Sequence, residues 1–457
     1  MNKSKSSRSG AAPSGRGVPK SAARGAAGIA AVAAPRILHA ENRRDAIRLA
    51  HVGVGTQGQV LLNNVLKCRP EQKVAPTAVC DIWHTNRDYA VRSLRKYYQC
   101  DVRGYVDLGE MLDAEKGKID AAIIATPDWV HHEHAIMCME AGLDVYCEKE
   151  MSNRIDNARR MVEASRKTGR LLQIGHQRRS NPRYRVLYEH VAVRKACGRL
   201  TNVSGNWNRD KPLTVNLPKG PADYLDPATL RRYGYEDMQH FRNWRWYRRY
   251  SGGPMADLGS HQVDVLNWVV GSVPSSVMAS GGADNYPHME WWDNIIAVYE
   301  WDVTDSGENH VVRGNYDLYS TTSHGGYQEV FMGTHGTAVI SEDATKGGFR
   351  CELRSEKNDW EKRHATGPCE YVVGIGIGDS LSGARVPGRY YPPIPVPADP
   401  KTEHMPHLEN FFRAIRGTEK LNCPAEVGFE TAVCILKVDQ AVQAQRKLTF
   451  DPAEFKA

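Results

Sequence analysis

The sequence predicts an α/β chain with two folded domains. The first is an N-terminal Rossmann dinucleotide-binding domain over residues 45–175, and the second is a C-terminal α+β domain over residues 176–457 with a large, mostly antiparallel sheet. Three observations predict this: a strand that enters a glycine turn and a helix, an acid at the end of the next strand, and a change after residue 199 to longer strands with few helices.

The glycine turn is the strongest signal. A strand over Ile47–Val52 is followed by Gly53-Val-Gly55-Thr56-Gln57-Gly58 and then by an apolar helix start. Gly53 permits the tight turn, Gly55 lets the backbone approach a pyrophosphate, and Gly58 lets helix and strand pack closely. The helix N-terminus adds N–H donors and positive dipole charge. The turn residues, with Thr56 and Gln57, are therefore predicted to bind a dinucleotide.

The second strand supports a preference for NAD. Val74–Cys80 ends in Asp81, 23 residues after Gly58, which is about the separation at which a carboxylate meets the adenosine ribose. A carboxylate repels a 2′-phosphate, so Asp81 favours NAD over NADP. Arg87 could still meet such a phosphate, and NADP stays an alternative.

Later strands also end in polar residues. The apolar run Ile119–Ala125 precedes a helix over Val130–Ala141. The strand Asp144–Cys147 precedes a helix that Ser152 is expected to cap and that runs through Lys167, and the strand Arg170–Ile174 follows. Ligands gather beyond the carboxyl ends of parallel strands. The residues predicted there as cofactor ligands are Thr126, Pro127, His131, Glu148, Lys149 and Gln177.

On these residues the chain resembles the Gfo/Idh/MocA family, named for glucose-fructose oxidoreductase and inositol dehydrogenase. The matching motifs are the glycine triplet, Thr-Pro-x-x-x-His at 126–131, Glu-Lys at 148–149 and Gly-x-Gln-Arg at 175–178. The resemblance implies an NAD(P)-dependent oxidoreductase that acts on a sugar, polyol or derivative. It also implies that the second domain covers the substrate cleft and supports a homo-oligomer, a dimer or tetramer.

One departure from the family concerns the residue after Lys149. The family usually has proline there, and this chain has Glu150. Either a cis peptide bond is kept without proline, or another backbone path presents the lysine. Glu150 could also pair with the lysine.

The second domain carries the predicted catalytic residues. Its expected strands are 200–207, 294–301, 310–319, 329–331 and 337–341. A loop at Gly252-Gly253-Pro254 should start a helix whose i, i+4 spacing puts Asp257 and His261 on one face. A carboxylate can orient an imidazole that acts as the base for a sugar hydroxyl. The family places its catalytic aspartate and histidine at this spacing, with the lysine that Lys149 matches. The alternative is that Asp257 caps the helix and His261 packs on the sheet.

Further residues are predicted to contact substrate. Asp264 lies seven positions after Asp257, Asn208 ends a strand between Trp207 and Arg209, and Arg178 belongs to the last motif of the resemblance. The segment Asp210–Tyr250 is rich in aromatic residues and arginines. It suits either a sugar site or, as the favoured interpretation, a subunit interface. Two helices near the C-terminus, after His404 and after Asn422, look like scaffold.

Two other functions stay open. One is a redox-neutral lyase or glycoside hydrolase with a tightly bound NAD that oxidises the sugar transiently. The other is a non-catalytic nucleotide-binding protein. The sequence shows no closed metal constellation, and the His131-His132-Glu133-His134 run is placed in the nucleotide domain, not at a metal site.

The amino-terminal residues 1–41 carry a net charge of +6 out of +7 for the chain, so the remainder is near neutral and gives no reason to expect nucleic-acid binding. This segment resembles a twin-arginine export signal without the twin arginines, which predicts a periplasmic protein. A disordered tail on a cytoplasmic protein is the alternative. No apolar run has membrane-spanning length. The ten cysteines lack metal spacing, and Cys80, Cys138, Cys147 and Cys434 are expected in the core.

Overall fold

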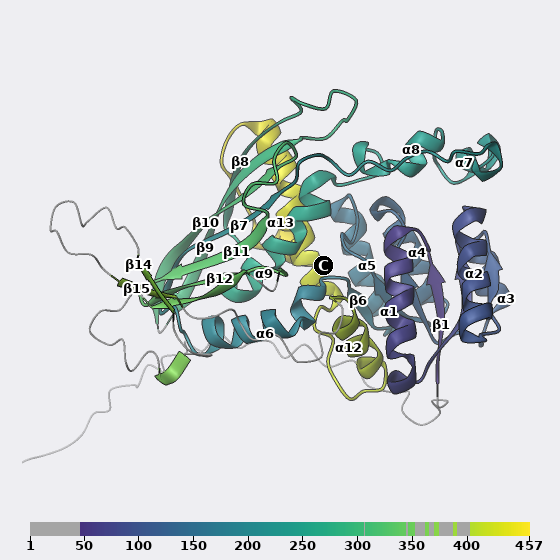
Figure 1. The fold of residues 1–457 in the computed structure, drawn as a ribbon, viewed down its shortest axis with the longest axis horizontal. Coiled ribbons are helices and arrows are strands. Elements are labelled where there is room, and N and C mark those ends of the chain that lie inside the picture. Colours follow the sequence, from purple (N-terminus) through teal and green to yellow (C-terminus); the bar gives the residue numbers. More distant parts are fainter. Residues whose placement is uncertain are drawn as a thin grey trace, which may run out of the picture. The chain divides into compact units, whose positions relative to one another are not determined.

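A computed structural model describes residues 46–305, 307–343, 346–351, 362–364, 370–373, 387–390 and 403–457. The segment 1–41, with its predicted export signal, lies outside the described residues. The remaining chain carries a six-stranded sheet and a ten-stranded sheet (Figure 1). Both predicted sheets are thus present.

The first sheet is parallel, in the order β3-β2-β1-β4-β5-β6. Its strands are β1 (Ile47–Val52), β2 (Val74–Cys80), β3 (Arg103–Tyr105), β4 (Ala121–Ile124), β5 (Asp144–Cys147) and β6 (Leu172–Ile174). The connecting helices are α1 (Thr56–Gln72), α2 (His84–Tyr98), α3 (Leu108–Ala114), α4 (Asp128–Glu140) and α5 (Ile155–Thr168). The strand order reverses beside β1, so the β1 and β4 ends form the switch point where α/β sheets bind ligands.

The start of α5 differs from the prediction. Arg154, not Ser152, precedes the helix, and the Ser152 hydroxyl instead accepts a hydrogen bond from the Arg154 N–H at 3.4 Å. Serine side chains make such local turns as readily as helix caps. The predicted cap was therefore wrong, and an irregular segment separates β5 from α5.

The second sheet is mixed, in the order β14-β15-β13-β12-β11-β7-β10-β9-β8-β16. The strands are β7 (Leu200–Asn208), β8 (Ser276–Gly282), β9 (Asn294–Asp305), β10 (Glu308–Tyr319), β11 (Tyr327–Gly333), β12 (Gly336–Ile340), β13 (Gly347–Cys351), β14 (Glu370–Val373), β15 (Pro387–Tyr390) and β16 (Leu448–Thr449). Every adjacent pairing is antiparallel except β7 with β10. The mostly antiparallel sheet was predicted correctly.

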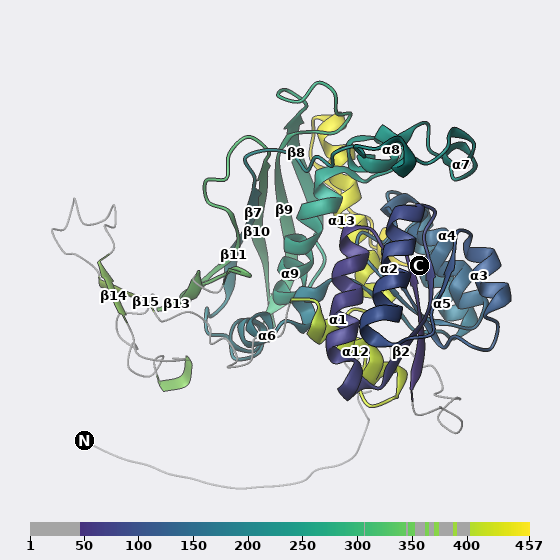
Figure 2. The ribbon, with the colours of Figure 1, turned by 45° about the vertical axis from the view of Figure 1, so that its right-hand side comes forward.

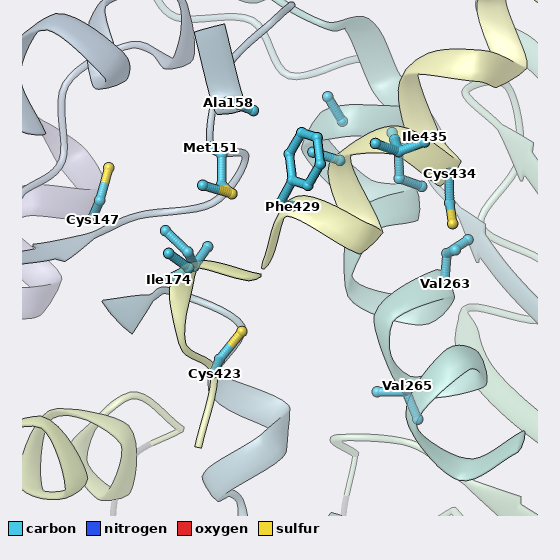
Figure 3. Close-up of a cluster of buried hydrophobic side chains, with 14 of the residues drawn as sticks. Cys147, Met151, Ala158, Ile174, Val263, Val265, Cys423, Phe429, Cys434 and Ile435 are labelled. Carbon is cyan, nitrogen blue, oxygen red and sulfur yellow. The ribbon is translucent and has the colours of Figure 1, made fainter. Parts of the chain in front are cut away.

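Helices of the second domain cover one face of this sheet. They are α6 (Pro182–Tyr188), α9 (Ser260–Val270) and α13 (Ala425–Ala444), while α12 (Met405–Ile415) packs on the nucleotide domain near α1 (Figure 2). A single buried cluster joins the two domains: Met151 and Ile174 meet Phe429 and Ile435 of α13 (Figure 3). A Cβ on Gly428 would lie 2.6 Å from Ile174 Cγ1, so α13 approaches β6 as closely as a glycine allows.

An inserted segment, Asp210–Tyr250, connects β7 to the helix that carries Asp257, and is here called the arm. It holds two short helices, α7 (Pro227–Arg232) and α8 (Met238–Arg242). Both lie over the nucleotide domain (Figures 1 and 2). Arm residues Leu225, Leu230 and Met238 share one buried cluster with Trp83 of the nucleotide domain.

Candidate active site

The glycine turn has the geometry of a phosphate cradle. Gly53 has φ +81°, a conformation that favours glycine, and a Cβ on Gly58 would lie 2.1 Å from Gly53 O. A Cβ on Gly55 would meet only Asn86 Nδ2, at 3.7 Å. Open space therefore faces Gly55, where α1 begins and its N–H groups are free of side-chain caps. These features fit a dinucleotide phosphate at this turn.

Asp81 follows β2 beside this turn. Its carboxylate accepts hydrogen bonds from the N–H groups of Val54 at 2.9 Å and Trp83 at 2.8 Å. Burial raises the pKa of Asp81, and these two bonds oppose the rise. The bonds hold the carboxylate in a fixed position on the wall of the cavity.

One cavity of about 500 Å³ runs from the glycine turn to the second domain. Its lining includes most of the predicted site residues: Gly53, Gly55, Thr56, Gln57, Asp81, Thr126, Pro127, His131, Glu148, Lys149, Gln177, Asp257 and His261. Four others do not line it: Gly58, Arg178, Asn208 and Asp264. Cofactor candidates from five strand ends thus share one space with the catalytic candidates Asp257 and His261 of the second domain.

His131 braces the cavity wall. Its Nδ1 lies 2.7 Å from Glu150 O and its Nε2 lies 2.6 Å from Thr126 O. Burial lowers the pKa of His131 to about 4. Because both ring nitrogens face backbone carbonyls, the ring ties the ends of β4 and β5 together and has no nitrogen directed at a ligand. Neighbouring His134 contacts the Thr126 hydroxyl at 3.0 Å and also lines the cavity.

Glu148 and Gln57 connect the glycine turn to the end of β5. Gln57 Nε2 donates to Glu148 Oε1 at 3.2 Å, and the Tyr146 hydroxyl donates to the same oxygen at 3.4 Å. A Cβ on Gly175 would lie 2.7 Å from Glu148 Oε2. The carboxylate is thereby fixed between the pyrophosphate turn and the lysine that follows it.

Lys149 points from the nucleotide domain to Asp257 in the second domain. The Lys149–Glu150 peptide bond is cis, as the family's proline would permit, although proline is absent. Lys149 Nζ donates to the backbone oxygen of Asp257 and lies 3.9 Å from its Oδ1. Glu150 faces away: it is buried, it accepts from the Met151 N–H at 2.8 Å, and it makes no ion pair with Lys149. The ammonium therefore stays in the cleft.

Asp257 belongs to a π-helical turn, Met255–Gly259, that runs into α9. Arg245 of the arm donates from Nε to its Oδ1 at 3.0 Å. Burial favours the neutral carboxyl, but Arg245, Lys149 and Arg209 together lower the pKa of Asp257 to about 2. Asp257 is an anion held among three cations.

His261 lies without the expected carboxylate partner. Nδ1 is buried and has no hydrogen-bond partner among the described residues. Its ring lies 5.6 Å from the Trp207 ring of β7. Burial, with Lys149 and Arg178 adding to it, lowers the pKa of His261 well below its ordinary value. The imidazole is therefore neutral at pH 7. The predicted hydrogen bond to Asp257 is absent, and Oδ1 of that carboxylate instead accepts from Arg245.

Three predicted substrate ligands contact other protein residues and do not line the cavity. Arg178 is buried and pairs with Glu329 and, at 2.9 Å, with Glu342. Asp264 is buried and pairs with Arg179 at 2.9 Å. These pairs tie the segment after β6 to the second sheet and to α9, and neither Arg178 nor Asp264 lines the cavity.

Asn208, at the end of β7, does not line the cavity. Its Nδ2 donates to His324 O at 2.9 Å, whereas Trp207 and Arg209 line the cavity. Side chains alternate across a strand, so the neighbours on either side face the opposite way from Asn208. The alternation signal in β7 was available from the sequence and identifies Trp207 and Arg209.

The arm also contributes residues to the cavity, although a subunit interface was the favoured interpretation of this segment. The arm residues that line the cavity are Leu213, Val215, Tyr233, Tyr235, Phe241, Arg242, Trp244 and Arg245.

Within the described chain, no group of three His, Cys, Asp or Glu side chains is arranged to hold a metal ion. No described helix is long and apolar enough to cross a membrane.

Family models match both domains. Residues 47–176 match an oxidoreductase family with an NAD-binding Rossmann fold, and residues 228–450 match the C-terminal alpha/beta domain of the same family. The chain belongs to the Gfo/Idh/MocA family. The family resemblance inferred from the strand-end motifs is confirmed.

Relatives and solved structures agree with this placement. An inositol 2-dehydrogenase of Acidiphilium cryptum is 26% identical over 78% of this chain and 98% of its own. A 2,7-anhydro-N-acetylneuraminate hydratase of Mediterraneibacter gnavus is 26% identical over 46% of this chain and 51% of its own. Across five similar curated relatives the chain spans only 35–55% of their length. A levoglucosan dehydrogenase crystallised with NADH and levoglucosan has a TM-score of 0.63 at 15% identity, covering 88% of this chain and 99% of its own.

Proposed function

We propose that this protein is an NAD-dependent oxidoreductase that acts on a secondary hydroxyl group of a sugar, polyol or derivative. The observation that carries the proposal is the convergence of Lys149, Asp257 and His261 in the same cavity as the glycine turn. A protein that only bound nucleotide would have no need of a lysine and a neutral imidazole in that cavity.

The residues suit removal of a hydroxyl proton. When bound, NAD supplies the hydride acceptor. His261 is neutral and can accept the hydroxyl proton at a ring nitrogen. Lys149, held by the backbone of Asp257, presents a cation toward the oxygen as negative charge develops there. Arg245 keeps Asp257 ionised, so the lysine stays positioned.

The face of Trp207 supports a carbohydrate substrate. It lines the cavity beside His261, and Tyr327 stacks on it at 4.8 Å. Arg209 lies over the same ring at 5.3 Å. Aromatic rings with a few polar groups beside them are typical of pockets that bind small molecules, and cationic donors suit the hydroxyl groups of a sugar.

NAD and a panel of sugars and polyols, incubated with the purified protein, test the proposal through NADH absorbance. We expect NADH to accumulate in proportion to the sugar consumed. Sugar cleavage or dehydration with only catalytic NAD would instead support the redox-neutral alternative, which the similarity to a hydratase favours. Neither product, with NAD bound, would favour a non-catalytic protein.

The outer face of the large sheet supports a homo-oligomer. Met278 of β8 pairs with Val298 of β9, and both are exposed, as is Ile296. Exposed apolar side chains gathered on a sheet face are typical of subunit contacts. Sedimentation of the native protein should give a dimer or tetramer, and the Val298→Lys variant should give a smaller species. A monomeric native protein would contradict the proposed homo-oligomer.

The proposed periplasmic location depends on residues 1–41 and is tested by fractionating cells that express the full chain.

A further inference from the structure

The arm contacts the nucleotide domain at the strand end that carries Asp81 and at the neighbouring strand end. Trp83 Nε1 donates to Asp223 O at 2.7 Å, and the Thr85 hydroxyl donates to Asp223 Oδ1 at 3.3 Å. Beyond the next strand, the Tyr233 hydroxyl donates to Asp107 Oδ2 at 3.2 Å. The contacts thus lie at the carboxyl ends of β2 and β3, the edge of the sheet on the Asp81 side of the glycine turn.

Aromatic packing reinforces these bonds. Trp83 meets Phe241 edge-to-face at 6.0 Å, and Trp129 Nε1 donates to the Tyr235 hydroxyl at 3.3 Å. A Cβ on Gly234 would lie 2.7 Å from the Trp129 ring. The arm therefore docks on the nucleotide domain through a buried cluster as well as through polar contacts.

The docked arm forms a wall of the cavity next to Asp81. Trp83, Phe241 and Arg242 all line it, and the Arg242 guanidinium lies over the Trp83 ring at 4.5 Å. Arg242 reaches only Asn216 O, at 3.3 Å, and has no carboxylate within 4.0 Å among the described residues. Aromatic rings suit a purine, and a cation without an acidic partner suits a phosphate.

We propose that the arm is part of the cofactor site: it closes over the adenosine half of the dinucleotide and slows its release. Release requires the arm to lift, which breaks the bonds from Trp83, Thr85 and Tyr233 and exposes the shared cluster. The inference depends on the NAD-binding domain and not on the substrate chemistry proposed above.

Exchange of bound cofactor tests the proposal without any substrate. The native protein, loaded with NAD, is mixed with excess isotopically labelled NAD, and the bound fraction is measured by mass spectrometry after rapid desalting. The test variant Trp83→Phe/Tyr233→Phe removes two tethering hydrogen bonds and keeps an aromatic ring at each position. The control Tyr224→Phe makes the same change at an exposed tyrosine of the arm.

We expect the native protein and the control to exchange slowly. The double variant should exchange about tenfold faster or more, because the docked arm loses two of the hydrogen bonds that oppose its release. Equal exchange rates for the native protein and the double variant would overturn the proposal, as would complete exchange of the native protein within the mixing time.

Limited trypsin digestion of the native protein provides a second readout that needs no variant. The arm contains Lys219, Arg231 and Arg242 as cleavage sites. ADP-ribose should slow cleavage within the arm about as well as NAD does, whereas nicotinamide mononucleotide should protect it little. Equal protection by both halves, or by neither, would contradict closure on the adenosine half.

Discussion

Lys149 and Asp257 are joined across the two domains. The ammonium of the lysine donates to the backbone oxygen of the aspartate and lies 3.9 Å from its carboxylate. The aspartate belongs to a π-helical turn that leads into α9. The contact fixes the distance between the nucleotide domain and the catalytic helix at the cleft itself.

Lys149→Met should lower kcat by about 10²–10³-fold, because it removes a cation aimed at developing negative charge and keeps most of the bulk. Cofactor affinity should fall only modestly. Steady-state kinetics with a substrate found in the panel, together with NAD titration, measure both. A matched Lys67→Met change, remote from the cavity lining, is the control. Near-native kcat would remove the lysine from the mechanism.

His261→Ala should cut kcat by about 10²–10⁴-fold, the usual scale of general acid–base catalysis, with NAD binding intact. His261→Gln, which keeps a polar side chain of similar size, should be impaired to the same extent. Recovery of activity in the glutamine variant would mean that the ring only packs against Trp207, and Lys149 would become the candidate base.

Asp81→Ala should weaken NAD binding by about tenfold or more, the scale of a lost hydrogen bond to a charged group, and should weaken NADP binding less. Titration with each nucleotide gives the ratio of dissociation constants. An unchanged ratio would show that the carboxylate does not contact the adenosine ribose and only accepts the hydrogen bonds from Val54 and Trp83.

Glu150 predicts a pH-dependent stability. Burial raises its pKa to about 8, above the unfolded value of about 4.3. Between these values the folded protein holds a proton that the unfolded chain has lost, so stability falls as pH rises, by up to about 1.4 kcal/mol per pH unit. Glu150→Gln should remove this slope between pH 5.5 and roughly 7.5. Urea unfolding of both proteins across that range measures it, and parallel curves would contradict the assignment.

The sequence allowed the nucleotide half of the site to be predicted because its residues follow a local rule: a turn or a strand end puts each one at the same edge of the sheet. Lys149, Glu148 and Gln177 line the cavity for that reason. The roles of residues that depend on partners distant in the sequence could not be predicted from this local rule. Asp264 and Arg178 look like cleft residues by position. In the structure, however, Asp264 pairs with Arg179, and Arg178 pairs with Glu342.

The arm shows the same limit. Its composition of aromatic residues and arginines fits a subunit interface as well as an intramolecular one, and the favoured interpretation was the former. Only the fold reveals that Trp83 and Tyr235 belong to one buried cluster. Residue spacing does not predict such a contact between residues that are about 150 positions apart.

The buried thiols have a practical consequence. Cys80, Cys138, Cys147, Cys197, Cys423 and Cys434 are enclosed in the core, and burial raises the pKa of Cys138 and Cys197 to about 12. Alkylating reagents attack thiolates that solvent can reach. Each of these six sulfurs should therefore react only in molecules that have opened. Both domains contribute cysteines to this set. The labelling rate of each cysteine therefore reports how often its own region of the native protein opens, without an added probe.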